Sequence, residues 1–422
     1  MEWVMHLPLR KMGAIRNVCQ IRMTDRKIKL LGKSPEELKH IVEELGLPKF
    51  TANQIADWVY HKKVREIDQM TNLSKSARER LSSKYCVGVT DYVHRLVSVD
   101  GTKKYLFPVM DGVPGGHTEK SHSESEGSVN AGLDLNSGLD VEPVSAADPV
   151  SVEDLKSSVA SVSAADSATE FVEAVMIPDG ERSTLCVSSQ AGCKMGCKFC
   201  MTGRQGFHGN LSVAEILSQF YSVDESDVLT NAVFMGMGEP LDNYDSLMRV
   251  IDVLTSSWGF AWSPKRITVS TIGVLPRLKD FLDNTRCHIA VSLHNPFPDE
   301  RLTIMPVQKA WSITEVVHLL DKYDFSGQRR VSFEYTMFDG FNDSPRHAEA
   351  LARLLRNLEC RVNLIRFHQI PDFPYRCAPR ERMLAFQKIM NDAGITTTIR
   401  ASKGEDILAA CGLLAGEHRD GR

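Results

Sequence analysis

Three cysteines lie within eight residues of each other, at Cys193, Cys197 and Cys200, with the spacing C-x3-C-x2-C. A structural zinc site takes four ligands, often as two distant C-x2-C pairs, and the sequence has no second pair. Cys186 or His208 could supply a fourth ligand, so zinc stays an alternative. Three thiolates favour a [4Fe–4S] cluster instead. Such clusters ordinarily take four cysteines, so the fourth iron would be open to a cofactor or substrate.

Two more cysteines stand near short motifs. Cys186 lies seven residues before the first cysteine of the trio, and Cys411 lies near the C-terminus in the sequence DILAACG. A free cysteine on its own is most often a small buried hydrophobe. The segment GMGEP, at 236–240, follows an apolar stretch, and alone it would indicate only a turn. Chemistry for these residues therefore depends on what positions them.

The C-terminal half alternates short apolar segments with helical periodicity. The predicted strands are 184–188, 231–237, 266–270, 287–293, 330–338, 361–367 and 396–400. Predicted helices between them include 212–222, 313–323 and 344–358. Repeated βα units with apolar strands predict a parallel sheet covered by helices. Six or seven units predict an α/β fold of the partial (β/α)6-type TIM-barrel kind, with its site on the loops after the strands.

The N-terminal part has a different pattern. Residues 34–46, 50–63 and 73–85 have helical spacing, and the first of these begins with a Ser cap and ends at a Gly. They predict a small helical accessory domain at 31–88. Residues 89–112 are predicted to form a β-hairpin leading into the core, with Asp100-Gly101 as a two-residue turn. The catalytic domain is expected at 171–415.

Residues 113–170 have a composition unlike the rest of the chain. They contain twelve serines, no aromatic residue, two lysines and eleven acidic residues, a net charge of −9. Such a segment buries too little apolar surface to offset its ordering entropy, so we expect a disordered acidic insertion. Residues 1–30 are expected to be a poorly ordered basic extension, and 416–422 a polar tail.

Charge and composition set the remaining limits. The net charge is −4, and without the acidic segment the rest sums to −4 + 9 = +5, which is compatible with RNA. No apolar run reaches the roughly 18 residues of a membrane helix, and the start is too polar for a signal peptide. We therefore expect a cytoplasmic protein without a membrane partner, whose ten cysteines stay reduced.

The motifs together resemble a known family. TLCVSSQAGCKMGCKFC, GMGEPLDN, SLHNP, VNLIRFHQIP and GEDILAACG are similar to motifs of the radical S-adenosylmethionine (SAM) superfamily, and within it to the dual-specificity 23S rRNA and tRNA adenine-C2 methyltransferases. The resemblance runs from about Leu31 to Gly412, interrupted by the acidic segment. It implies one [4Fe–4S] cluster on Cys193, Cys197 and Cys200, with SAM on the open iron.

The resemblance also implies roles for three further residues. Cys411 would take a methyl group from one SAM, and a second SAM, cleaved to a 5′-deoxyadenosyl radical, would remove hydrogen from that methyl group. The carbon would then add to adenine C2, and Glu173 would remove the C2 proton. Cys186 would attack the Cys411 sulfur, releasing the methylated RNA and leaving a transient Cys186–Cys411 disulfide. Two SAM molecules are thus consumed per turnover.

SAM contacts carry over from the family at positions that match its motifs. They are Gly238, Glu239, Ser270, Ser292, Leu293, His294 and His368. Many members have Asn where this chain has His368, and either side chain can donate or accept a hydrogen bond. Phe199 is expected either to pack near the adenine of SAM or to close the cysteine loop. The implied partners are 23S rRNA, tRNA and a flavodoxin- or ferredoxin-type electron donor, and a monomer is expected.

Two alternatives stay open from the sequence. A sister enzyme that methylates C8 of the adenine and confers antibiotic resistance shares the cluster and both mechanistic cysteines. The match through residues 50–63 and through the segment that contains Cys411 favours C2. The other alternative is a zinc-stabilised RNA-binding protein without catalytic activity.

Overall fold

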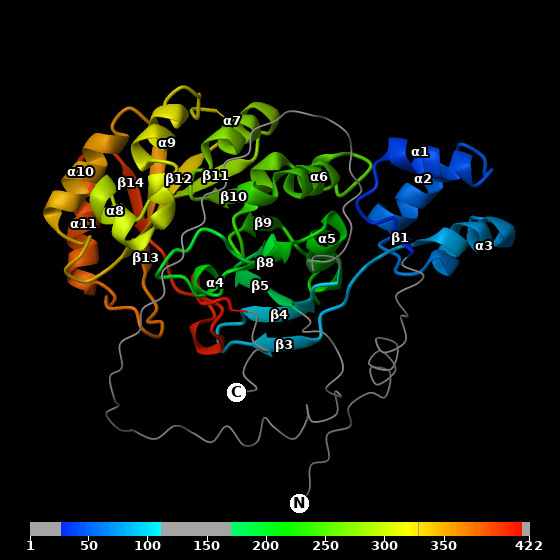
Figure 1. Ribbon diagram of the computed structural model, residues 1–422, viewed down its shortest axis with the longest axis horizontal. Helices are drawn as coiled ribbons and strands as arrows, with labels where there is room; N and C mark the ends of the chain where they lie inside the picture. The colour runs from blue at the N-terminus through cyan, green and yellow to red at the C-terminus, as the bar shows by residue number, and fades with distance from the viewer. Residues whose placement is uncertain (1–26, 111–169, 328, 416–422) are drawn as a thin grey trace, which may run out of the picture. The chain divides into compact units, whose positions relative to one another are not determined.

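The computed structural model describes residues 27–110, 170–327 and 329–415, and a ten-stranded sheet forms its centre (Figure 1). The strand order is β14-β13-β12-β11-β10-β9-β6-β5-β4-β3. The strands are β3 His94–Val97, β4 Lys103–Pro108, β5 Phe171–Asp179, β6 Arg182–Cys186, β9 Asn231–Phe234, β10 Ile267–Thr271, β11 His288–Ser292, β12 Val331–Met337, β13 Cys360–Arg366 and β14 Thr396–Ile399. All seven predicted strands are present.

The seven strands from β6 to β14 form a parallel ladder, whereas β3 to β6 pair antiparallel. Strands β14 and β3 stand at opposite ends of the order, so the sheet curves without closing. The predicted partial barrel is confirmed. Because the seven strands are parallel, their C-terminal ends lie on one rim, where the loops can converge on a common site.

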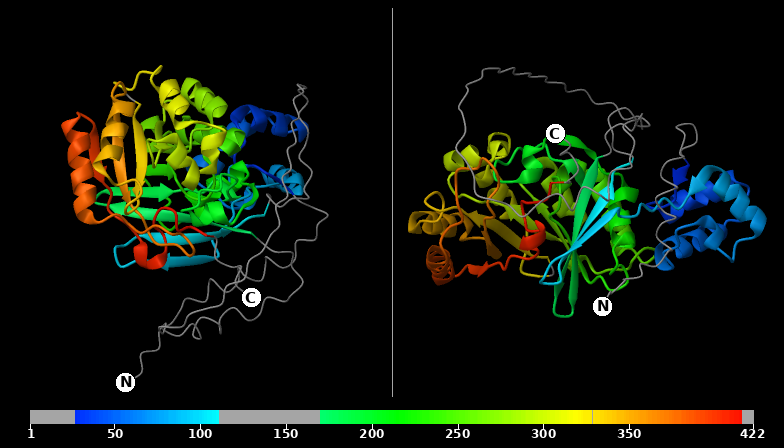
Figure 2. Two further views of the ribbon diagram at one scale, coloured as in Figure 1. Left: turned by 60° about the vertical axis from the view of Figure 1, so that its left-hand side comes forward. Right: turned by 90° about the horizontal axis from the view of Figure 1, so that it is seen from below.

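Helices cover the outer side of the curved parallel part of the sheet (Figures 1 and 2). They are α5 Val213–Ser222, α6 Tyr244–Thr255, α7 Leu275–Asn284, α8 Pro298–Ile304, α9 Ile313–Leu320, α10 Pro345–Leu355 and α11 Arg380–Asp392. Helix α5 starts with a capping box in which Ser212 and Glu215 exchange hydrogen bonds. Its buried residues include Ile216 and Phe220, which pack into the core.

The N-terminal helices are α1 Pro35–Glu44, α2 Thr51–Ala56 and α3 Lys75–Lys84, and a short parallel pair joins β1 Ile28–Lys29 to β2 Tyr85–Cys86. Ser34 and Glu37 form the capping box of α1. The helical region contacts the barrel by a hydrogen bond from the Tyr221 hydroxyl to the Val59 carbonyl, at 2.8 Å. The predicted helical nature of this region is confirmed, whereas the domain limits stay predictions.

The predicted hairpin β3–β4 is present, but its turn is longer than expected. Ser98 N–H donates to the Thr102 carbonyl at 2.8 Å, so three residues lie in the turn instead of two. Gly101 occupies the left-handed position of this turn, with φ +84°. The two-residue prediction was wrong because Asp100 accepts hydrogen bonds from Thr102 N–H and from Gly404 N–H, which shape a wider loop.

Three predicted segments fall wholly or largely outside the described residues. These are the basic extension at 1–30, the acidic insertion at 113–170 and the polar tail at 416–422. Strands β4 and β5 flank the second of them and pair up to Pro108 and Phe171. Within the described part of the chain, no helix is long and apolar enough to cross a membrane.

Candidate active site

The three clustered cysteines lie on one loop at the rim of the barrel. Strands β7 Gln190–Gly192 and β8 Phe207–Asn210 form a small antiparallel pair that closes this loop, and helix α4 Met201–Arg204 follows Cys200. Cys193 N–H donates to the Gly206 carbonyl at 2.7 Å. A Cβ at Gly192 would lie 2.0 Å from the Gly206 oxygen, so only glycine allows this closure.

Burial raises the pKa of all three loop thiols, that of Cys193 to about 12. The charges of Cys200 and Cys193 would raise the pKa of Cys197 further, so the three sulfurs lie near one another. Such thiols bind a metal by exchanging their protons for it. The loop therefore offers three thiolate ligands, of which Cys197 is buried and the other two are partly exposed.

The number of these thiols bears on which metal group the loop can hold. A tetrahedral zinc ion, with Zn–S bonds of about 2.3 Å, would bring its sulfur ligands to about 3.8 Å from each other. Among the described His, Cys, Asp and Glu side chains, no group of three is arranged to hold a single metal ion. The loop supplies three thiolates, one fewer than the four ligands of a structural zinc site, and a [4Fe–4S] cluster on three cysteines keeps one iron open for another ligand.

The segment GMGEP follows strand β9 and packs against the cysteine loop. Gly238 has φ +99°, and a Cβ there would lie 2.5 Å from the Gln190 side chain. Glu239 is buried and accepts hydrogen bonds from Leu241 N–H at 3.1 Å and Ile272 N–H at 2.9 Å. Burial raises the pKa of Glu239 to about 7 despite these bonds. The carboxyl is thus fixed in direction by its two backbone donors.

The predicted SAM contacts on β10 and β11 lie at the same rim. Ser270 is near the end of β10, and Ser292 ends β11, followed by buried Leu293. His294 comes next, with an unusual positive φ of 58°. Its ring lies 4.9 Å from the ring of Phe199, on the cysteine loop, in an edge-on arrangement. The structure therefore brings the cysteine loop and the SLH segment together.

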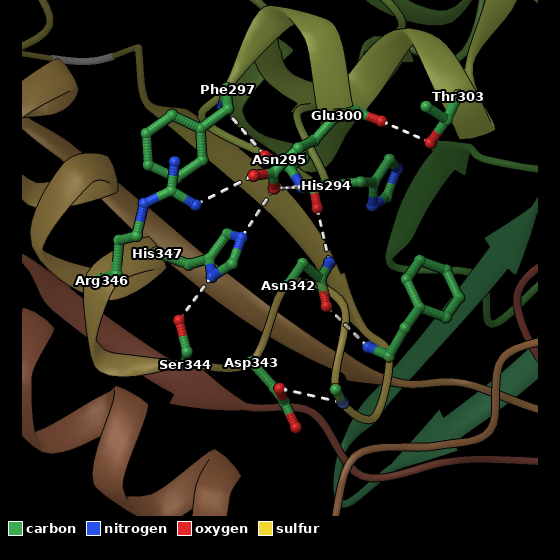
Figure 3. Close-up of polar contacts among 12 residues, drawn as sticks. His294, Asn295, Phe297, Glu300, Thr303, Asn342, Asp343, Ser344, Arg346 and His347 are labelled. Carbon is green, nitrogen blue, oxygen red and sulfur yellow. Dashed lines mark hydrogen bonds and ion pairs between the residues drawn. The ribbon is translucent and has the colours of Figure 1, made fainter.

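Hydrogen bonds fix His294 in this conformation (Figure 3). Asn342 donates to the His294 carbonyl at 2.6 Å and to the Thr336 carbonyl at 2.8 Å. Thr336 N–H donates to His294 Nδ1 at 3.0 Å, so the proton of the neutral ring is on Nε2. Burial, with the positive charge of Arg301, lowers the pKa of His294 to about 3. His294 is therefore a neutral donor through Nε2.

Both ring nitrogens of His368 have partners in the structure. Its Nδ1 pairs with Glu405 at 3.0 Å, and its Nε2 lies 3.1 Å from the Ser402 hydroxyl. Both partners belong to the segment that leads to Cys411. In this structure His368 therefore holds the C-terminal segment, and its contact with SAM stays a prediction.

The C-terminal segment lies across α4, directly after the cysteine loop (Figure 1). Met201 N–H donates to the Gly412 carbonyl at 2.9 Å, and the Thr202 hydroxyl donates to the Leu414 carbonyl at 2.7 Å. At its other end, the β3–β4 turn holds the segment through Asp406, which accepts from the Ser98 hydroxyl at 2.5 Å. Residues 212 and 308 positions apart in sequence are thus joined on the two sides of Cys411.

Cys411 lies near charged and ionisable groups of the site. The residue is exposed, yet burial, with the negative charges of Glu334 and Cys200, raises the pKa of its thiol. Cys186, buried at the end of β6, also has a raised pKa, caused by burial and by the charge of Cys411. The two cysteines are therefore near each other, and both are free.

Glu173 lies on β5 and is buried, not solvated. The ammonium of Lys104, itself buried, lies 3.2 Å from one carboxylate oxygen. The other oxygen accepts from Ala415 N–H at 3.2 Å, four residues after Cys411. The Lys104 ammonium also lies 3.5 Å from the Leu408 carbonyl. Glu173 and Lys104 together therefore connect β4 and β5 to the segment that carries Cys411.

Sequence reasoning missed four residues of this site. They are Lys104, Arg301, Glu334 and Asn342, all of which are buried. For Glu334 a signal existed, because an acidic residue inside an apolar strand must face a polar surface. Its partner across the ladder is Asn363, which donates to Glu334 at 2.8 Å. For Arg301 no signal existed, because PDER looks like an ordinary solvated helix start.

Family models match two parts of the chain. Residues 28–87 match the N-terminal domain of the ribosomal RNA large subunit methyltransferases. Residues 187–353 match the radical SAM superfamily. The first match covers the N-terminal helices, and the second starts just before the cysteine loop and extends into α10.

Whole-chain relatives agree with these matches. A protein of Porphyromonas gingivalis named probable dual-specificity RNA methyltransferase RlmN is 48% identical over 93% of this chain and 95% of its own. A Syntrophus aciditrophicus protein named dual-specificity RNA methyltransferase RlmN is 34% identical over 93% and 97%. The crystal structure of a radical SAM methyltransferase from Sphaerobacter thermophilus superposes with a TM-score of 0.74, at 32% identity, over 92% of this chain and 100% of that one.

Proposed function

This chain belongs to the RlmN family of dual-specificity radical SAM RNA methyltransferases, and we propose that it methylates C2 of a specific adenosine in 23S rRNA and in tRNAs. One observation carries the proposal: the C-terminal segment lies on α4, so that Cys411 is near both Cys186 and Cys200. A methyl carrier and the thiol that releases it must share one cavity beside the cluster loop.

Adenine C2 is an electron-poor carbon without a useful lone pair, so it cannot attack the SAM methyl group directly. Cys193, Cys197 and Cys200 would hold the cluster, and SAM would bind at the rim between Glu239 and His294. When bound, the cluster and SAM supply the methyl group, the electron and the carbon radical that the reaction needs. The family implies these cofactors, and the three-cysteine ligation is our proposal.

The protein's own residues perform the remaining steps. The Cys411 thiol loses its proton and takes the methyl group as a nucleophile, so that it carries the carbon to adenine C2. Glu173 then accepts the C2 proton; Lys104 at 3.2 Å supplies the opposite charge that favours an ionised base. The Cys186 thiolate attacks the Cys411 sulfur, so that an S–S bond forms and the bond between the Cys411 sulfur and the carbon breaks. The carbon keeps the bonding electron pair and takes up a proton, which gives the methyl group and releases the methylated RNA.

Two variants separate these cysteine roles. Cys411→Ala removes the carbon carrier, so methyl transfer should be abolished. Cys186→Ala keeps the carrier but cannot release it, so a covalent enzyme–RNA adduct should appear as a shifted gel band that nuclease removes. Cys287→Ala, at a buried cysteine elsewhere in the barrel, is the matched control and should turn over normally. Normal turnover by Cys186→Ala would refute its resolving role.

The sister reaction at C8 is the second candidate, because it would use the same cysteines. Mass spectrometry of the modified nucleoside separates the two, and a methyl group on C8 would overturn the assignment to C2. We further propose that a flavodoxin- or ferredoxin-type protein supplies the electrons and that the enzyme acts as a monomer. Sedimentation of the reconstituted enzyme tests the second point.

A further inference from the structure

Arg301, on α8, is fully buried, and all its described partners are neutral oxygens. Nε donates to the Leu293 carbonyl and Nη2 to the Ser292 carbonyl, both at 2.9 Å. Nη2 also lies 3.3 Å from the Ile272 carbonyl, and Nη1 donates to Gln308 Oε1 at 2.6 Å. The guanidinium therefore joins the ends of β10 and β11, where SAM is expected, without meeting a carboxylate.

The guanidinium of Arg301 lies in the same part of the site as the cysteine loop. Burial lowers the pKa of Arg301 to about 10, so the guanidinium stays charged at neutral pH. The guanidinium holds the Ser292 and Leu293 carbonyls, and the next residue, His294, places its ring against Phe199 of the cysteine loop.

Neighbouring contacts hold α8 and the cysteine loop together. Lys198, between the second and third loop cysteines, donates its N–H to the Ile304 carbonyl at 3.0 Å, three residues after Arg301. Glu300, next to Arg301, pairs with His347 of α10 at 2.7 Å (Figure 3). Because both sides of α8 are tied to neighbours, the guanidinium cannot easily move away from the loop.

A fully buried cation without an opposite charge is strongly destabilising, whereas a charged partner compensates much of that cost. We infer that Arg301 is the built-in counter-cation of the anionic iron–sulfur cluster and raises the cluster's reduction potential. This inference rests on the proposed function. Three thiolates on the oxidised cluster core give a net negative charge, so the missing partner of Arg301 is the cluster with its cysteines.

The consequence for reduction follows from charge alone. A one-electron donor of low potential adds one electron to the cluster without forming or breaking a protein bond, and the cluster becomes more negative. A nearby cation stabilises the more negative state more strongly, and net charge is one of the factors that set cluster potentials. Arg301 therefore makes reduction easier and acts as a positioning and tuning residue, not as a group that touches RNA.

The test neutralises the cation without removing it. Gln308→Glu places a carboxylate on Arg301 Nη1 and keeps the shape of the side chain. Gln308→Met removes the same hydrogen bond but adds no charge, and is the matched control. Each variant is reconstituted anaerobically, and the midpoint potential of the cluster is measured by redox titration with dithionite, followed by electron paramagnetic resonance.

We expect Gln308→Glu to lower the ratio of reduced to oxidised cluster about tenfold at a fixed potential, which is about 59 mV for one electron. The midpoint of Gln308→Met should equal that of the wild type. Equal midpoints in all three proteins would overturn the inference. An absence of any one-electron cluster signal in the wild type would instead refute the proposed function itself.

A second pair keeps the test decisive if Gln308→Glu does not retain iron. Arg301→Lys keeps the charge and loses most of the carbonyl contacts, whereas Arg301→Gln keeps a polar group and loses the charge. The inference stands if the iron content and the midpoint potential of Arg301→Lys are close to those of the wild type and those of Arg301→Gln are not. If Arg301→Lys and Arg301→Gln lose the cluster equally, the hydrogen bonds of Arg301 and not its charge retain the cluster, and the inference fails.

Discussion

At the scale of single residues, the site depends on buried polar groups whose directions are fixed. His294 is the clearest case, because its backbone has φ +58° and its ring accepts a hydrogen bond from Thr336 N–H. A non-glycine residue with positive φ persists only where its surroundings hold it. Asn342 provides that support through the His294 carbonyl. The strain and the fixed proton position together indicate a functional side chain.

The titration of His294 gives a prediction about stability. Its pKa is about 3 in the folded protein, because of burial and Arg301, and about 6.5 in the unfolded chain. The unfolded state therefore binds more protons between these values, and the free energy of unfolding falls as the pH falls below 6.5. At about 1.4 kcal/mol per pKa unit, this group costs the protein about 2 kcal/mol between pH 7 and pH 5.

Urea unfolding at pH 7 and pH 5 tests this prediction with His294→Asn, which tolerates the left-handed backbone. The variant should lose about 2 kcal/mol less than the wild type over this range. His318→Gln, at an exposed histidine, should lose as much as the wild type. The same loss in His294→Asn and wild type would show that His294 does not carry the acid sensitivity.

At the scale of elements, the sequence predicted those strands and helices that depend on a local pattern of residues. The seven parallel strands were visible because their apolar runs lie between helical segments, and the Ser34 cap marked the start of α1. The pair β7–β8 was missed, because three residues of QAG carry no β-branched or alternating signal. The predicted length of the β3–β4 turn was wrong, because the N–H of Gly404, some 300 residues away, donates to Asp100.

The β3–β4 turn also leads to a prediction about coupling. Asp406 accepts from the Ser98 hydroxyl and from Val99 N–H, and so anchors the segment that carries Cys411. Asp406→Ala should free this segment, so that methylated RNA formed per SAM cleaved falls about tenfold, as expected for two lost hydrogen bonds. SAM cleavage itself should continue, because the cysteine loop is unchanged.

The matched control is Asp392→Ala, which removes an exposed ion pair with Lys388 far from the segment. Its product ratio should equal that of the wild type. Parallel measurement of methylated nucleoside and of 5′-deoxyadenosine gives the ratio. If Asp406→Ala keeps the wild-type ratio, the turn does not position Cys411.

At the scale of the whole molecule, the site is assembled from distant parts of the chain. The cysteine loop near 193–200, the SLH segment at 292–294 and the C-terminal segment meet at one rim of the barrel, joined by β4 and β5 through Lys104 and Glu173. The sequence could predict the parts through their motifs. It could not predict their contacts, because the burial of Glu173 and Arg301 depends on tertiary packing.

The acidic segment gives a prediction at this scale. Strands β4 and β5 pair up to Pro108 and Phe171, and Val109 N–H donates to the Glu170 carbonyl at 2.8 Å. The two ends are therefore adjacent, and a short Gly/Ser turn can join them after deletion of residues 113–169. Because insertions at such loop positions are commonly tolerated, kcat/KM for RNA should stay within about threefold of the wild type. A large loss would show that the segment takes part in catalysis.

The most direct test of the account is the isotopic composition of the product. The reconstituted enzyme is incubated without oxygen with RNA, a reductant and SAM whose methyl group carries three deuterium atoms. If Cys411 carries the carbon, one deuterium is removed before transfer, so we predict 2-methyladenosine with two deuterium atoms. Retention of all three, or a label on C8, would contradict the account.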